Sequence, residues 1–500
     1  MVTMVHKRAT LWLFLMACVK HVPPCLDVAD AINHHHHSLL KRVSLEVAER
    51  PLEDPAANTA TQDVRAPELA PPTVRPTTGF PVYVMLPLDT VWLIDCDDGS
   101  QRAMIKREKA MDLGLSTLKT AGVEGIMVDV WWGIVEREQG VYDFSAYQRL
   151  FEKAREAGLK IQAVMSFHAA GGNVGDTCTI PLPKWVLDVG EEEPGIFYTD
   201  RQGVINRECL SLGCDEVPLF NGKTPLKLYR DFVAAFADTF GSMFGTDCFL
   251  VTIPKQRPQL TFPPGNTLQE VTIGLGPAGE LRYPSYPEGD GRWRFPGVGE
   301  FQCYDRFMMA DLRREAEALG QPEWGLTGPH DAGTYNSRAY ETGFFCDGGS
   351  WTTEYGCFFL QWYSGALVRH ADRVLSAVSE VLTKRGRPRR AIAMVGDEDD
   401  EDAGSFQQFR IEPAVKLGIK LAGVHWWFRT ASHASELTAG YFNTRGRDGY
   451  DPILAVAARY NARVSFTCVE MRDCEHPDEA MCSPQGARNT MRRTQVTHHH

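Results

Sequence analysis

Apolar, strand-like runs alternate with helical segments from residue 80 onward, and this alternation limits the possible folds more than any other feature of the chain. Six runs have the nearly continuous apolar character of strands that are buried on both faces: Pro81–Leu88, Gly125–Trp132, Lys160–Phe167, Leu268–Ile273, Ile419–Val424 and Val464–Cys468. Five helices are predicted around them: Ile105–Ala121, Phe144–Ala157, Pro225–Phe240, Glu300–Leu319 and Phe358–Leu382. The alternation predicts a parallel α/β architecture.

Residues that could take part in catalysis or ligand binding lie at or just beyond the C-terminal ends of these runs. They are Asp129, His168, the loop that begins at Gly274, His425 and Thr467. An α/β barrel carries its active site at this end of the strands, and a doubly wound sheet binds ligands there as well. The sequence contains no GxGxxG or Walker motif, so nothing indicates a nucleotide.

Several segments stand apart from the alternation. Residues 1–79 are predicted to form an N-terminal tail and linker, because Arg50–Thr78 is rich in proline, alanine, threonine and acid. Cys248–Gly265 and Met394–Pro413 have the character of insertions before the fourth and fifth strands. The second contains six consecutive acids, which are expected to form a solvated loop; a cation site is the alternative.

Charge and cysteine content disfavour several classes of function. The formal net charge of −12 does not suit a nucleic-acid groove. The thirteen cysteines are odd in number and include no CxxC pair, which fits unpaired thiols better than disulfides or a zinc site. The apolar run Leu11–Val19 is too short to span a bilayer but has the length of a signal-peptide core, so a targeting role stays open. The run His34–His37 is expected to be disordered rather than a metal site.

The loop from Gly274 to Asp305 carries the carboxylate of Glu280 just after the fourth predicted strand, among the aromatic residues Tyr283, Tyr286, Trp293 and Phe295. Aromatic faces beside a carboxyl group suit sugar rings, and an apolar surround raises a carboxyl pKa as a proton donor requires. The alternative is a solvated loop with one more acidic residue.

Other candidate residues lie in the remaining strand-end motifs. Asp129 is followed by two tryptophans, and the glycine-rich segment after His168 predicts a flap with Asp176 at its tip. Lys420, His425 and Thr467 complete the set of candidate substrate contacts. The alternatives are an aspartate that caps a turn, a flexible surface loop, a charged strand end and a core threonine.

These motifs together resemble the β-amylases, which are inverting glycoside hydrolases that release maltose from α-1,4-glucans. The similar stretches include GVEGIMVDVWWGIVE, SFHAAGGNVGDT, GLGPAGELRYPSYPE, GVHWWF and FTCVEMRD, in family order between Pro81 and Asp473. The resemblance implies a (β/α)8 TIM-type barrel over residues 80–485, with long loops at the C-terminal face, and a non-family tail over residues 486–500.

The resemblance also implies roles. Glu280 is expected to be the general acid, and Asp129, His168, Asp176, Lys420, His425 and Thr467 are expected to contact substrate. Starch or maltooligosaccharide would be the partner, with no metal, organic cofactor, nucleic acid or membrane, and a plastid or the cytoplasm would be the compartment rather than the outside of the cell.

The chain departs from the family pattern in one respect that concerns chemistry. Inversion needs a second carboxylate as general base, roughly 6.5–9.5 Å from the acid. The family carries it on strand seven in a motif like GENALPRYD, which does not occur here. Only six of eight strands can be assigned, so the barrel is expected to be incomplete. Two alternatives follow: a catalytically impaired glucan-binding or regulatory homologue, and a nonfunctional truncated product.

Overall fold

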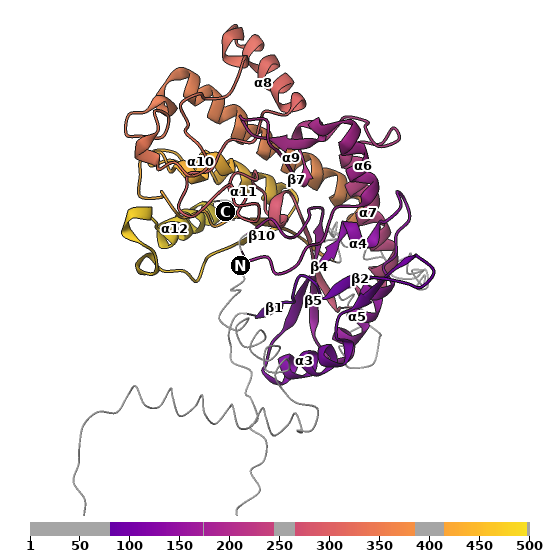
Figure 1. Ribbon diagram of the computed structural model, residues 1–500. Helices are drawn as coiled ribbons and strands as arrows, with labels where there is room; N and C mark the ends of the chain where they lie inside the picture. Colours follow the sequence, from indigo (N-terminus) through magenta and orange to yellow (C-terminus); the bar gives the residue numbers. More distant parts are fainter. Residues whose placement is uncertain (1–80, 174, 245–265, 386–414, 498–500) are drawn as a thin grey trace, which may run out of the picture. The chain divides into compact units, whose positions relative to one another are not determined.

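The computed structural model of this protein describes residues 81–173, 175–244, 266–385 and 415–497 (Figure 1). At its centre lies a parallel sheet of six strands in the order β1-β4-β5-β8-β9-β10. Their bounds are β1 Tyr83–Met85, β4 Gly125–Trp131, β5 Lys160–Ser166, β8 Leu268–Ile273, β9 Lys416–Leu421 and β10 Arg463–Phe466. These are the six strands that the apolar runs predict, with ends that differ by a few residues.

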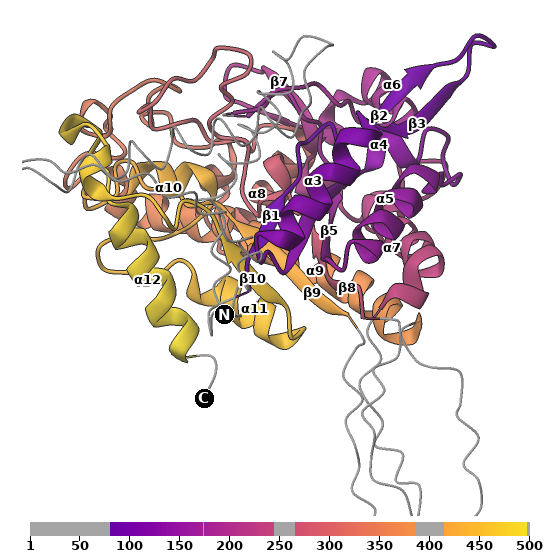
Figure 2. The same ribbon diagram turned by 90° about the horizontal axis from the view of Figure 1, so that it is seen from below.

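The order of the strands in the sheet is the order of the strands in the sequence, and every neighbouring pair is parallel. A doubly wound sheet reverses its order at a switch point, so this topology is that of a β/α barrel. The sheet curls, but β1 and β10 do not pair with each other (Figure 2). Within the described residues, the expected incomplete barrel is therefore confirmed, with β1 and β10 as its edges.

Helices cover the outer face of the curled sheet (Figure 2). They are α3 Glu108–Thr120, α5 Ser145–Glu156, α7 Pro225–Phe240, α9 Glu354–Arg385 and α11 Asp451–Arg459. The remaining α-helices of the described residues are α4 Trp132–Val135, α6 Lys184–Glu192, α8 Arg306–Ala318, α10 Ala434–Ala439 and α12 Pro484–Thr497. Aromatic side chains of α5 and α7 form much of the packing between helices, as in the ring contact of Phe151 with Phe240 at 4.8 Å between centroids.

Local capping explains where two of the helices begin. Helix α7 begins at Pro225, as predicted, and the hydroxyl of Thr224 accepts a hydrogen bond from the amide of Lys227 at 3.2 Å. Helix α8 begins at Arg306 rather than at Glu300, because the carboxylate of Asp305 accepts hydrogen bonds from the first amides of the helix. Residues 300–304 instead form a buried, non-helical approach to the helix.

In the part of the chain that the structure describes, two hairpins lie outside the central sheet and were not predicted. Strand β2 (Val91–Asp95) pairs antiparallel with β3 (Gln101–Ile105), so the predicted helix over Ile105–Ala121 begins only at Glu108. Strand β6 (Phe197–Thr199) pairs with β7 (Ile205–Leu210), within the long connection between β5 and α7. Short antiparallel pairs of this kind give a weaker periodic signal than a buried parallel strand.

Some predicted segments fall outside the described residues: the tail 1–79 with its histidine and apolar runs, and the segments Cys248–Gly265 and Met394–Pro413. The predicted tail over residues 486–500 falls largely within α12, where Ala487 and Met491 are buried. All ten cysteines of the described residues are free thiols. None of the helices in that part of the chain combines the length and apolar character needed to cross a bilayer.

The interior of the sheet leads to a prediction about Gly418 on β9. A β-carbon at this position would lie 2.5 Å from Oε1 of Glu270 and 2.7 Å from Oγ1 of Thr272. Glu270 is buried and held by Thr272 and Arg463, so it has little freedom to move away. We expect Gly418→Ala to lower the free energy of unfolding by about 1–3 kcal/mol in denaturant titrations followed by circular dichroism.

The matched control is Gly446→Ala, since a β-carbon there would meet no atom within 4 Å. We expect that variant to unfold at the parent's midpoint. Equal stability of Gly418→Ala and Gly446→Ala would contradict the crowded interior described for β9.

Candidate active site

Glu280 follows β8, at the end of the short 3₁₀-helix η4 (Pro277–Gly279). Its residue surface is only 8% exposed, and its Oε2 accepts a hydrogen bond from Nε of Arg282 at 2.8 Å. The sequence predicted an apolar surround for this carboxyl group. The structure instead places a guanidinium against it, so the predicted environment of Glu280 is wrong.

Arg282 joins the Glu280 loop to the glycine-rich loop after β5. Its NH2 group donates to Oδ1 of Asn173 at 2.9 Å, and Nδ2 of Asn173 donates to Oε1 of Glu208 at 2.6 Å. The same Glu208 oxygen accepts from the amide of Ala278 at 2.8 Å. Burial raises the pKa of Glu208, while nearby Arg282 opposes that shift. Glu280, Arg282, Asn173 and Glu208 thus form one continuous polar chain across the two loops.

Asp129 and His168 occupy the ends of the neighbouring strands. Asp129 on β4 accepts a hydrogen bond from the hydroxyl of Ser166 on β5 at 2.7 Å. Burial raises the pKa of Asp129, and the Ser166 hydrogen bond and the charge of Lys420 act against this. Burial, with the cations of Lys420 and Arg282, lowers the pKa of His168 to about 3, so its ring is neutral near pH 7.

Lys420 on β9 connects this group to the Glu280 loop. Its Nζ donates to the carbonyl of Ala278 at 2.9 Å, and its own carbonyl accepts from the amide of Leu281 at 2.8 Å. The ammonium also interacts electrostatically with Asp129 and His168. The structure therefore brings four of the predicted residues together: Asp129, His168, Glu280 and Lys420.

Asp176 organises the glycine-rich loop predicted as a flap. Its Oδ2 accepts from the amides of Gly171 at 2.7 Å and Asn173 at 3.0 Å. In this conformation the carboxylate stabilises a turn of its own loop, although it lies close enough to Asp129 to influence its pKa.

His425 and Thr467 form a second group, at the ends of β9 and β10. The hydroxyl of Thr467 accepts from the amide of Gly423 at 2.7 Å, and Nδ1 of His425 lies 2.8 Å from the carbonyl of Gly423. Among the described residues, no hydrogen bond or ion pair joins this pair directly to Glu280. Burial lowers the pKa of His425.

The aromatic residues predicted around Glu280 divide into two sets. Tyr286 lies under the guanidinium of Arg282 at 4.2 Å and contacts Trp293 and Trp426, so this set borders the site. Tyr283 was predicted to belong with them but is fully buried and stacked on Tyr363 at 3.8 Å between centroids. It supports the loop from below rather than offering a face to a ligand.

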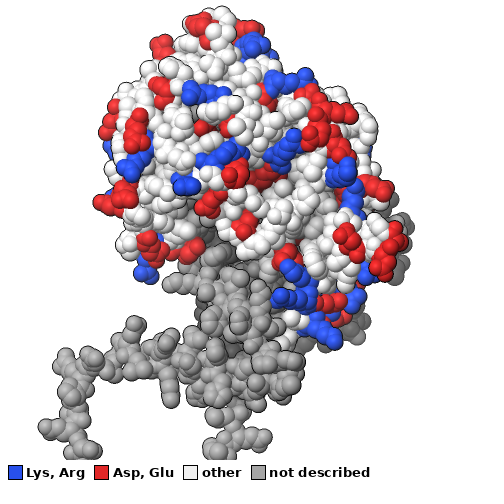
Figure 3. Space-filling view, viewed as in Figure 1, with Lys and Arg blue, Asp and Glu red and all other residues white. Residues whose placement is uncertain are grey.

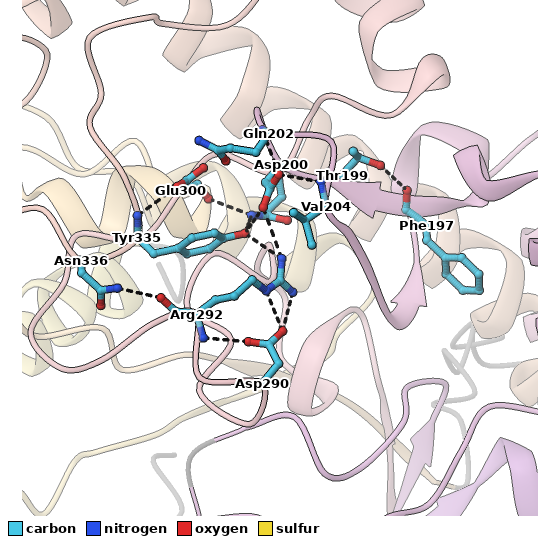
Figure 4. A network of polar contacts seen from close by, with 11 residues as sticks. Phe197, Thr199, Asp200, Gln202, Val204, Asp290, Arg292, Glu300, Tyr335 and Asn336 are labelled. Atoms are coloured by element: carbon cyan, nitrogen blue, oxygen red, sulfur yellow. Dashed lines mark hydrogen bonds and ion pairs between the residues drawn. The ribbon is translucent and has the colours of Figure 1, made fainter.

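A second polar network anchors the far end of the Gly274–Asp305 loop (Figure 4). Asp200, in the turn between β6 and β7, accepts from the hydroxyl of Tyr335 at 2.8 Å and from Arg292 at 3.3 Å. The amide of Tyr335 donates to Oε1 of Glu300 at 3.1 Å. Burial, with Asp200 as the next cause, raises the pKa of Glu300 to about 7. The network fixes the loop to the hairpin β6–β7.

Sequence reasoning missed three residues of the polar chain. Arg282 carries a usable signal, because it lies two residues after Glu280 in an extended segment, and such residues point to the same side. Asn173 and Glu208 carry no such signal, since their contacts depend on a hairpin that the pattern did not predict.

On the surface, acidic and basic side chains are interspersed over the face in Figure 3, so no large patch of one sign is visible there.

Known proteins resemble this chain in sequence and in fold. A family model described as Glycosyl hydrolase family 14 matches residues 83–254, 262–387 and 398–498, and so includes every candidate site residue. "Beta-amylase 2, chloroplastic" of Oryza sativa subsp. japonica is 48% identical over 412 residues, which are 82% of this chain and 64% of that protein. "Beta-amylase 1, chloroplastic" of Arabidopsis thaliana is 46% identical over 81% of this chain and 61% of its own length.

Among solved structures, the catalytic domain of beta-amylase from Paenibacillus polymyxa matches with a TM-score of 0.58 and 27% identity, over 79% of this chain and 81% of that chain. The chain thus spans less than two thirds of the length of the two chloroplastic relatives. The breaks in the family match overlap the two segments predicted as insertions.

The pKa of Glu300 leads to a prediction about stability and pH. A carboxyl group with a raised pKa binds its proton more tightly in the folded state, so stability falls as pH rises from the ordinary value of 4.5 to about 7. Glu300→Gln keeps an acceptor for Tyr335 but cannot ionise. We expect its melting temperature, relative to the parent, to increase by on the order of 2 °C between about pH 5 and about pH 8.

Asp305 also has a pKa raised to about 7 by burial, but it contributes equally to parent and variant and cancels in the difference. Glu317→Gln, at an exposed position on α8, measures the effect of removing a solvated carboxyl group. A difference between Glu300→Gln and the parent that stays constant with pH would rule out titration of Glu300 in this range.

Proposed function

We propose that this chain, which belongs to glycosyl hydrolase family 14, binds the non-reducing end of an α-1,4-glucan and places a glucosidic oxygen beside Glu280 for protonation. The single observation that carries the proposal is the buried Glu280, held by Arg282 at the C-terminal end of a β/α sheet beside Asp129, His168 and Lys420. The names of the two chloroplastic relatives support the substrate class.

Glu280 has one oxygen available for acid catalysis. Oε2 is occupied by Arg282, whereas Oε1 has no hydrogen-bond partner among the described residues and is not among their buried unpaired atoms. The proton to be donated therefore belongs on Oε1. Transfer of that proton to the leaving oxygen would proceed as the bond to the anomeric carbon breaks.

The surrounding residues suit the binding of sugar hydroxyls. Asp129 offers a carboxylate acceptor, Lys420 offers a donor, and the neutral ring of His168 offers either. Nδ1 of His168 is buried and has no hydrogen-bond partner among the described residues, so a sugar hydroxyl would satisfy an otherwise unpaired atom. Asp176, His425 and Thr467 are proposed as further contacts on the strength of the family motifs.

The sequence contains no motif that would supply the general base, which is the group that activates water. The family's general-base motif is absent from the 500 residues, and loss of a general base typically lowers the rate by roughly 10²–10⁴-fold. The absence of this motif therefore favours a second function, which is the binding of glucan with little turnover. Both functions use the same site and differ only in the fate of the bound sugar.

We predict that the purified chain binds maltopentaose in calorimetry but releases little maltose from soluble starch. Azide is a nucleophile that needs no general base, so it should restore turnover and yield a maltosyl azide of inverted configuration. The matched variant Glu280→Gln retains the shape of the side chain but has no proton to donate. It should bind maltopentaose like the parent and form none of the azide product.

Each alternative has its own outcome in this experiment. Robust maltose release by the parent without azide, lost in Glu280→Gln, would mean that a base is present elsewhere in the chain. Azide product formed equally by parent and variant would remove Glu280 from the role of acid. A chain without near-ultraviolet circular dichroism would be the nonfunctional product, because fixed aromatic packing would then be missing.

We also propose a plastid location, which the names of the two chloroplastic relatives support. Residues 1–79, predicted to be a tail with a possible targeting role, are the part to test. Fused to a fluorescent protein in plant cells, they should direct it into plastids, whereas a fusion that begins at Phe80 should not. Uniform cytoplasmic fluorescence of the first fusion would contradict this location.

A further inference from the structure

His425, His476 and Cys482 form a cluster that the proposed reaction does not use as a group. One ligand atom from each residue lies within 4.8 Å of the other two. The two imidazole rings lie 4.6 Å apart between centroids and are tilted by 46°, and Cys482 is 3% exposed. The cluster joins the end of β9 to the segment that precedes α12.

The hydrogen bonds of His425 fix which nitrogen is free. Its Nδ1 lies 2.8 Å from the carbonyl of Gly423, and a carbonyl can only accept, so Nδ1 carries the proton. Nε2 is left with a lone pair, and it is buried without a hydrogen-bond partner in the described part of the chain. Histidines that bind metals usually donate their other ring N–H to a carbonyl or carboxylate in this way.

His476 repeats the observation from the opposite side of the cluster. Its Nε2 is also buried without a partner, although the residue as a whole is partly exposed. Two unpaired imidazole nitrogens side by side are costly unless something satisfies both. A cation does so, because it accepts both lone pairs at once.

The backbone holds the third ligand in place. The segment with Cys482 runs along the residues after β9, with the amide of Trp427 bonded to the carbonyl of Ala480, that of Arg429 to Met481, and that of Ser483 to His425. Among the described residues, the Sγ atom of Cys482 makes a single weak hydrogen bond, to the carbonyl of Ala480 at 3.8 Å. The thiol is therefore fixed beside the two rings with no strong competing partner.

We propose that His425, His476 and Cys482 bind a divalent cation of the zinc class. Two imidazoles and a thiolate suit zinc and exclude calcium or magnesium, which take oxygen ligands. Zinc bonds of about 2.0–2.3 Å require the three ligand atoms to draw together by on the order of 1 Å. Three protein ligands leave a fourth coordination position open. The cluster differs from the expectation that this chain has no metal ligands.

Metal binding is expected to release one proton, from the thiol of Cys482. Burial raises the pKa of Cys482 to about 12, so the free thiol is protonated and its proton leaves when the metal–sulfur bond forms. Because His425 is also a proposed sugar contact, the metal and glucan should exclude each other. This expectation of mutual exclusion rests on the proposed function. The metal measurement itself needs no glucan, so the two proposals fail separately.

The test uses the full chain, freed of metal by chelation and titrated with Co²⁺ alone. We expect a near-ultraviolet thiolate-to-cobalt absorption band that Zn²⁺ abolishes by displacing cobalt. Cys482→Ser should lack the band, and His476→Gln should weaken zinc binding by at least about 10–100-fold. His476 is partly exposed, so its variant reports on the site even if Cys482→Ser does not fold.

Two controls separate this site from other ligands of the chain. Cys474→Ser changes an exposed cysteine nearby and should leave the band unchanged. Replacement of both histidine runs of the sequence, His34–His37 and His498–His500, by glutamine should also leave the band unchanged. Absence of the band in the parent, or a band that survives in Cys482→Ser with the fold intact, would overturn the proposal.

Discussion

The buried guanidinium of Arg282 is the interaction on which the candidate active site depends. Its side chain is 3% exposed, and it donates to Glu280, to Asn173 and to the carbonyl of Tyr283 while lying over the ring of Tyr286. A buried charge is tolerated only when its donors are satisfied, so these partners must be in place together. The position of Glu280 is thus fixed by two loops at once, so a change in either loop would be transmitted to this carboxylate.

The two layers of the site come from different parts of the architecture. The parallel strands deliver Asp129, His168 and Lys420 to one end of the sheet, as any β/α barrel does. The hairpin β6–β7 supplies the supporting layer, with Glu208 below the Glu280 loop and Asp200 in the network of Figure 4. Three of the four grouped candidate residues therefore lie at strand ends of the regular framework, whereas part of the network that supports the Glu280 loop comes from an added hairpin.

This division explains how much the sequence alone could predict. The six strands, the start of α7 at Pro225 and the grouping of Asp129, His168, Glu280 and Lys420 follow from buried apolar runs and capping signals, which are local. The start of α8 was misplaced because the Asp305 cap competes with a continuous helical pattern. Glu208, Asn173 and the cluster of His476 with Cys482 could not be predicted, because their partners are distant in sequence and meet only through tertiary packing.

The strictly sequential order of the strands has a consequence for how the chain is made. Each strand pairs with the strand that precedes it in the sheet, so a chain emerging from the ribosome finds every new strand's template already synthesised. Assembly needs no late strand to insert between two earlier ones, which keeps the entropic cost of closing loops low at each step. The sheet can therefore grow in the direction of translation, with the newest edge always the one that is ready to accept the next strand.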